Sequence, residues 1–132
     1  MGKKVRVLLT KSDQDAHEMG IRYIVQLLKN AGMEVIFTRY NIIDEVAEAA
    51  EQEDVFAIGL SFYGSGLMYD VTRLMQLLKE KELEEIEVFL GGTIVQEEKE
   101  ELINIGVSEV FLPGVGSPQD IVKFVTSKAN MS

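Results

Sequence analysis

Hydrophobic residues follow two alternating patterns along this chain. Short, nearly continuous apolar runs such as residues 4–10 (KVRVLLT) and 55–61 (VFAIGLS) have the length and β-branched content of buried parallel strands. Between such runs, apolar residues recur every three or four positions, as amphipathic helices require. In residues 19–32 the face formed in this way contains Ile21, Ile24, Val25, Leu27 and Leu28.

The pattern predicts five strands that alternate strictly with five helices. The strands are predicted at residues 4–10, 33–40, 55–61, 86–92 and 107–112, and the helices at residues 19–32, 42–54, 66–83, 95–106 and 117–129. Gly32 is expected to end the first helix, with Ser117 as N-cap and Pro118 as the first residue of the last. The alternation predicts an α/β fold with helices on both faces of a parallel sheet. At this length we expect the flavodoxin-like (Rossmann-like), doubly wound order 2-1-3-4-5, with residues 1–132 as one domain.

Charge and composition narrow the function classes. The chain has a net charge of −9, which disfavours nucleic-acid binding, and we interpret its acidic runs as solvated helix faces. It contains no cysteine, which excludes disulfides and thiolate metal sites. No apolar run is long enough to cross a membrane, and residues 1–11 lack the cleavage site of a signal peptide. We therefore expect a cytoplasmic protein without membrane contact.

The single histidine, His17, lies in the loop that follows the first strand. Ligands of open α/β sheets bind beyond the carboxyl ends of the strands, where the strand order reverses. In the predicted order this point lies between the first and third strands, so His17 should lie near the loops 61–66 (SFYGSG) and 91–95 (GGTIV), and residues 112–117 (LPGVGS) also come close in this arrangement.

A lone histidine after a strand is usually a surface or capping residue, but Asp15 two positions earlier favours a functional interpretation. A metal-binding histidine generally donates its other ring N–H to a carboxylate or carbonyl, and Lys11 is available to hold the aspartate. One histidine is too few for a protein-only zinc or iron site. A metal at His17 must therefore arrive with most of its coordination filled, as in a macrocycle.

These residues resemble a known family. Asp15-x-His17-x-x-Gly20 after the first strand, Ser61 at the end of the third, and Gly91-Gly92 at the end of the fourth are similar to the D-x-H-x-x-G, S-x-L and G-G motifs of the cobalamin-binding domain of adenosylcobalamin-dependent mutases. The likeness covers almost the whole chain. It is closest to the small subunits and C-terminal domains of acyl-CoA mutases of the methylmalonyl-CoA and 2-hydroxyisobutyryl-CoA type.

The resemblance implies a role for each matching residue. His17 would be the lower axial ligand of the cobalt, displacing the cofactor's own dimethylbenzimidazole, with Asp15 on its far nitrogen, Lys11 steadying Asp15, and Ala16 between them in the motif. The displaced nucleotide tail would lie in a slot between sheet and helices. Its expected contacts are Gly20, Ser61, Gly91 and Gly92, although a double glycine is also an ordinary strand-end turn.

The chain departs from the S-x-L motif, because Tyr63 stands where the family has leucine. Two interpretations stay open: the ring narrows the slot for the nucleotide tail, or its hydroxyl takes a polar contact there.

The family's activity implies a cofactor-binding subunit of an isomerase. In such mutases the cofactor performs a radical rearrangement of a substrate held in a separate (β/α)₈-barrel subunit, so the protein by itself would be inactive.

The main alternative is a corrinoid methyl carrier of a methyltransferase system, but these proteins usually add an N-terminal helical cap and read D-x-H-D-I-G-K-N. A receiver domain would need acidic residues where Lys11 and Ser61 stand, and a flavin protein would need a phosphate-binding loop. A cobalamin sensor without catalysis also stays open. The substrate and the choice of acyl-CoA over glutamate mutase rest on the resemblance alone.

Overall fold

A computed structural model describes residues 4–15, 17–64 and 66–131, and its elements alternate as predicted. The strands are β1 (Arg6–Ser12), β2 (Glu34–Tyr40), β3 (Ala57–Phe62), β4 (Glu87–Gly92) and β5 (Glu109–Phe111). The helices are α1 (Met19–Asn30), α2 (Asp44–Glu53), α3 (Leu67–Glu80), α4 (Gln96–Asn104) and α5 (Gln119–Met131). The strands pair in parallel in the order β2-β1-β3-β4-β5, which confirms the predicted flavodoxin-like topology.

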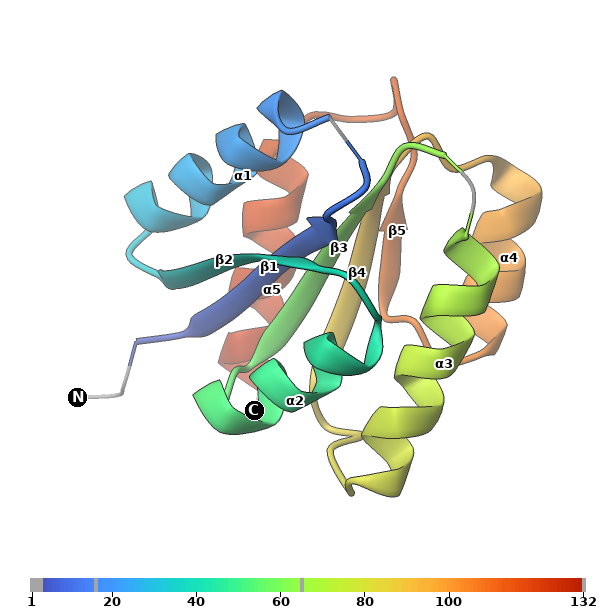
Figure 1. Ribbon diagram of the computed structural model, residues 1–132. Helices are drawn as coiled ribbons and strands as arrows, with labels where there is room; N and C mark the ends of the chain where they lie inside the picture. Colours follow the sequence, from blue (N-terminus) through green and yellow to red (C-terminus); the bar gives the residue numbers. More distant parts are fainter. Residues whose placement is uncertain (1–3, 16, 65, 132) are drawn as a thin grey trace.

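Helices cover both faces of the sheet: α1 and α5 lie on one, and α2, α3 and α4 on the other (Figure 1). Successive side chains of a strand point to opposite faces. Leu8 therefore packs in the cluster under α2, α3 and α4, while its neighbours Val7 and Leu9 pack under α1 and α5. Burial on both faces explains why the strands are apolar runs rather than alternating ones.

Element ends differ from the sequence prediction by a few residues. β1 continues to Ser12, so Lys11, predicted in the loop, is a strand residue. Gly32 follows the first helix with φ of +91°, as expected of a helix stop. α5 begins at Gln119, and Ser117 and Pro118 form the turn that leads into it: the Asp120 N–H donates to the carbonyl of Ser117 over 2.9 Å, and the Ser117 N–H donates to the Asp120 carboxylate over 3.0 Å.

The end of β4 requires glycine at position 92. Its φ is +113°, and a Cβ there would lie 1.9 Å from the carbonyl oxygen of Phe62. The same carbonyl accepts the N–H of Thr93 over 2.8 Å, so it is not free to move away. The glycine thus permits the close contact between the ends of β3 and β4.

We expect Gly92→Ala to lower the free energy of unfolding by about 2–4 kcal/mol, because backbone strain and a collision with main chain act together. Gly32→Ala is the matched control: φ is +91° there, but a Cβ would meet nothing within 4 Å, so strain acts alone. Urea denaturation measures both variants. Equal losses in the two would contradict the assigned contact with Phe62.

Candidate functional site

The buried Lys11 holds the main chain of the loop after β1 by hydrogen bonds. The residue is 1% exposed, and its ammonium donates to the carbonyl oxygen of Ser12 over 3.0 Å and to that of Asp15. The N–H of Asp13 donates to the carbonyl of Tyr40 over 2.8 Å, which ties the same loop to β2. The predicted support of Asp15 by Lys11 thus runs through the main chain of Asp15, with the carboxylate left for another partner.

That partner is His17. One oxygen of the Asp15 carboxylate accepts both the backbone N–H of His17 over 2.9 Å and the Nδ1 of its ring over 2.7 Å. The aspartate side chain is 13% exposed and the imidazole 64% exposed, so the anchor is shielded while the ring faces outward. Ala16, between them, lies outside the described residues.

The environment of Asp15 favours its charged form. Burial opposes ionisation, but the hydrogen bonds from the His17 backbone and ring, with attraction to His17 and Lys11, outweigh it and lower the pKa of Asp15 below its ordinary 3.8. Because the pKa of Asp15 is lower in the folded than in the unfolded protein, ionisation of its carboxyl stabilises the fold at pH values above the unfolded pKa. The stabilisation is lost as the pH falls through the folded pKa.

We therefore expect Asp15→Asn to be less stable than the parent protein near neutral pH, with the gap shrinking as the pH falls from about 5 to about 3. Urea denaturation across this range measures it. Asp13→Asn removes an exposed carboxylate from the same loop and serves as the control. A gap that stays constant down to the lowest pH would contradict the assigned pairing.

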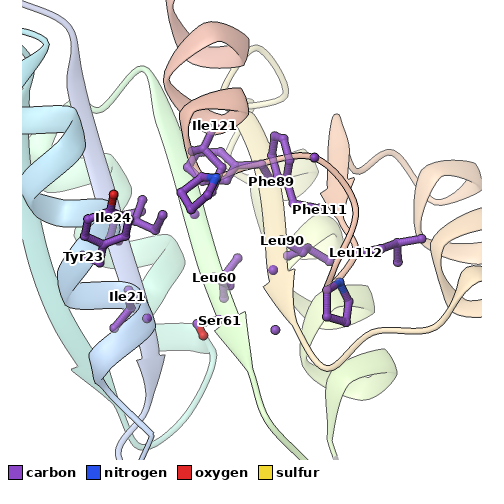
Figure 2. Close-up of a pocket in the computed structure, with 18 of the residues that line it drawn as sticks. Ile21, Tyr23, Ile24, Leu60, Ser61, Phe89, Leu90, Phe111, Leu112 and Ile121 are labelled. Atoms are coloured by element: carbon purple, nitrogen blue, oxygen red, sulfur yellow. The ribbon is translucent and has the colours of Figure 1, made fainter.

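A pocket of about 280 Å³ opens between the sheet, α1 and the loop that follows β5 (Figure 2). Its volume is close to the lower end of the ~300–1,000 Å³ that small-molecule sites occupy. Figure 2 shows Ile21, Tyr23 and Ile24 on the α1 side and Ser61 at the end of β3. The loop 112–118 closes the opposite side, as its place after β5 suggested. The lining is largely apolar with few polar groups, as is typical of small-molecule binding sites.

Strand register explains which predicted residues meet in this pocket. Lys11 pairs with Ser61, and Ser61 with Gly91, so the three positions form one row across β1, β3 and β4. Gly20, Ser61, Tyr63, Gly91 and Gly92 line the pocket. Lys11, Asp15 and His17 are absent from the lining: Asp15 and His17 lie in the adjoining loop, and Lys11 lies in β1 and holds that loop.

The glycines of the site have different roles. A Cβ at Gly91 would meet nothing within 4 Å, so this position leaves space open. A Cβ at Gly20 would lie 3.1 Å from the hydroxyl of Tyr63. Gly59 was missed from the sequence: a Cβ there would lie 2.5 Å from the ring of Phe89 and 2.6 Å from Leu9. A glycine inside an otherwise apolar strand is the signal that could have found it.

Tyr63 joins the pocket to the histidine loop. It lines the pocket, and its ring stacks on the imidazole of His17 with the centroids 4.8 Å apart and an angle of 17° between the planes. Of the two interpretations left open by the sequence, neither included this contact. His17 and Tyr63 lie 46 positions apart in the sequence. They meet because β1 and β3 are paired, so that the loops after these two strands are neighbours.

Within residues 4–15, 17–64 and 66–131, no three His, Cys, Asp or Glu side chains gather to hold a metal ion. The donor available at the pocket is one exposed imidazole whose Nδ1 is engaged by a carboxylate. Such a group suits a metal that already carries its other ligands. In the same described part of the chain, no helix is long and apolar enough to cross a membrane.

Solved structures share the fold. A cobalamin-binding protein from Desulfitobacterium hafniense aligns with a TM-score of 0.80 and 18% identity over 96% of this chain and 60% of that one. A receiver domain of a Francisella response regulator aligns with a TM-score of 0.75 and 14% identity over 97% of this chain and 98% of that one. Because proteins of such different function align almost equally well, these likenesses establish the architecture alone.

Sequence comparison is more specific. The pivalyl-CoA mutase small subunit of Xanthobacter autotrophicus is 36% identical over 98% of this chain and 87% of its own length. The 2-hydroxyisobutanoyl-CoA mutase small subunit of Aquincola tertiaricarbonis is 32% identical over 93% of this chain and 90% of its own. Methylmalonyl-CoA mutase of Cereibacter sphaeroides is 33% identical over 89% of this chain, which spans 17% of that protein. The model of the B12 binding domain matches residues 5–121, and the chain therefore belongs to the B12-binding domain family.

Proposed function

We propose that this chain is the cobalamin-binding small subunit of an adenosylcobalamin-dependent acyl-CoA mutase, with residues 1–132 as one cobalamin-binding domain and His17 as lower axial ligand of the cobalt. The observation that carries the proposal is the Asp15–His17 pair, a shielded carboxylate that holds an exposed imidazole beside a mostly apolar pocket. Relatives named as mutase small subunits cover nearly the whole chain, and mutases are isomerases.

The loop prepares one nitrogen for coordination. In the neutral imidazole, a carboxylate acceptor at Nδ1 places the ring proton on that nitrogen, which leaves the lone pair on Nε2. A carboxylate partner also makes the imidazole a stronger donor toward a metal. The Lys11 ammonium holds the main chain of this loop, so the backbone from which the imidazole extends is fixed.

The pocket fits a displaced nucleotide tail. It is open where Gly91 lacks a side chain, and Ser61, in the same row of the sheet, offers a hydroxyl. Its aliphatic and aromatic lining suits a flat aromatic base. Cobalamin held with its tail in this slot and His17 on the cobalt would be bound base-off.

The cofactor supplies radical chemistry for a carbon-skeleton rearrangement, and this chain binds, orients and tunes it. Relatives named as mutase small subunits match this chain over 87% and 90% of their own length. We therefore propose that the substrate binds to a separate large barrel subunit, and that residues 1–132 by themselves give no turnover.

The test is reconstitution. The purified chain is titrated with adenosylcobalamin and followed by its visible spectrum, then assayed for acyl-CoA rearrangement with and without an acyl-CoA mutase large subunit. We expect saturable binding by the chain alone and turnover only with both subunits. Absence of binding would overturn the proposal. Methyl transfer from bound methylcobalamin to the acceptor substrate of a methyltransferase, without mutase turnover, would show a methyl carrier instead.

A further inference from the structure

Tyr63 makes a contact for which the family motif has no counterpart. The side chain follows β3 directly, and its ring lies nearly parallel to the imidazole of His17, 4.8 Å away between centroids. It also lines the pocket, and its hydroxyl lies close to Gly20 at the start of α1. The family's leucine has no aromatic ring and could not stack in this way.

The hydrogen bond to Asp15 does not by itself fix the imidazole. It holds Nδ1 2.7 Å from the carboxylate oxygen, but the oxygen accepts over a broad range of directions and the Cβ–Cγ torsion of histidine is soft, so the plane of the ring can still tilt. The ring is 64% exposed, so solvent offers little resistance to that rotation. A flat partner against one face removes the remaining freedom, because rotation would break the stacking contact.

We propose that Tyr63 is a positioning residue for His17: together with Asp15 it fixes the plane of the imidazole, so that Nε2 is already oriented when the cobalt of the corrinoid arrives. The inference rests on the proposed function. Aromatic stacking in proteins corresponds to about twofold to tenfold in an equilibrium constant, and we expect an effect of that size on corrinoid affinity.

The cofactor-free protein allows a direct test of the stacking. Since the chain contains one histidine, its imidazole C–H signals in an NMR spectrum need no further assignment. We expect ring-current shifts of these signals in the parent protein and in Tyr63→Phe, and their loss in Tyr63→Leu. Tyr69→Leu removes an exposed tyrosine, 75% accessible, from α3 and should leave the signals unchanged.

Binding tests the positioning role, and cobinamide is the sharper probe because it lacks the nucleotide tail that would occupy the pocket. We expect Tyr63→Leu to weaken cobinamide binding about threefold to tenfold, Tyr63→Phe to restore it, and Tyr69→Leu to have no effect. In the background of His17→Ala, Tyr63→Leu should have no further effect, because there is then no ring to orient.

The outcomes separate this inference from the function on which it rests. An equal loss with and without His17 would make Tyr63 a wall of the pocket only, and unchanged cobinamide affinity or imidazole signals in Tyr63→Leu would also overturn the inference. Both results leave His17 as the ligand. If the parent protein binds neither cobinamide nor cobalamin, the proposed function fails and the positioning role fails with it.

Discussion

The His17→Ala protein is expected to bind cobalamin roughly tenfold or more weakly than the parent protein and to lose all imidazole coordination. Loss of a group that only orients a ligating histidine lowers metal affinity by about 10–100-fold. Removal of the ligand itself should therefore lower the affinity by at least about tenfold. We expect a partial loss because the pocket proposed for the nucleotide tail does not include His17 in its lining.

Electron paramagnetic resonance of the reduced, cobalt(II) state gives the decisive measurement. A nitrogen ligand splits the cobalt signal, and growth on ¹⁵N-histidine labels position 17 alone, because the chain has no other histidine. We expect the splitting to change with the label in the parent protein and to be absent in His17→Ala. Asp13→Ala, from an exposed position in the same loop, should keep it.

Two results would contradict the axial assignment. One is a splitting in the parent protein that does not respond to the label. The other is identical affinity and an identical spectrum in His17→Ala. A partial result is also informative: if free imidazole restores the splitting in His17→Ala, the site itself is intact and only the ligand has been lost.

The Gly91→Leu protein is expected to lose about 100-fold or more in cobalamin affinity while keeping its fold. Gly91 lines the pocket beside Ser61, and a Cβ there meets nothing within 4 Å, so the new side chain extends into open space rather than into the core. It would occupy the volume that the tail needs. Displacing a well-fitted aromatic group from an apolar site costs several kcal/mol, which corresponds to at least two orders of magnitude.

Gly64→Leu is the matched control for this substitution. Gly64 also has nothing within 4 Å of a Cβ, but it lies in the loop after β3 and is not part of the pocket lining. Cobinamide, which has no tail, should bind Gly91→Leu nearly as well as the parent protein. Unchanged cobalamin affinity in a variant that urea denaturation shows to be folded would place the tail elsewhere.

Much of the fold and part of the site could be predicted from the sequence. Apolar runs separated by amphipathic segments predicted alternating strands and helices, and the strand order was expected as the commonest arrangement at this length, which the structure confirms. The D-x-H motif predicted a carboxylate on the histidine, since residues two positions apart in a loop are always close. The ends of elements were less certain: β1 includes Lys11, and its burial depends on neighbouring strands rather than on local sequence.

Other features of the site depend on distant parts of the chain. The row formed by Lys11, Ser61 and Gly91 exists only through strand register. Gly92 lies against the Phe62 carbonyl, a packing reason for glycine that the double-glycine motif does not reveal.

The sequence by itself determined three features: the layered α/β architecture, the loop in which the single imidazole lies, and the carboxylate that pairs with this imidazole. Hydrophobic periodicity and short-range spacing, on which these features depend, are local properties of the chain. Only the tertiary structure decided that Tyr63 stacks on His17 and that Gly59 lies under the ring of Phe89. The physical reason is that these contacts join segments whose approach is set by the packing of the whole sheet, and no short stretch of sequence specifies that distance.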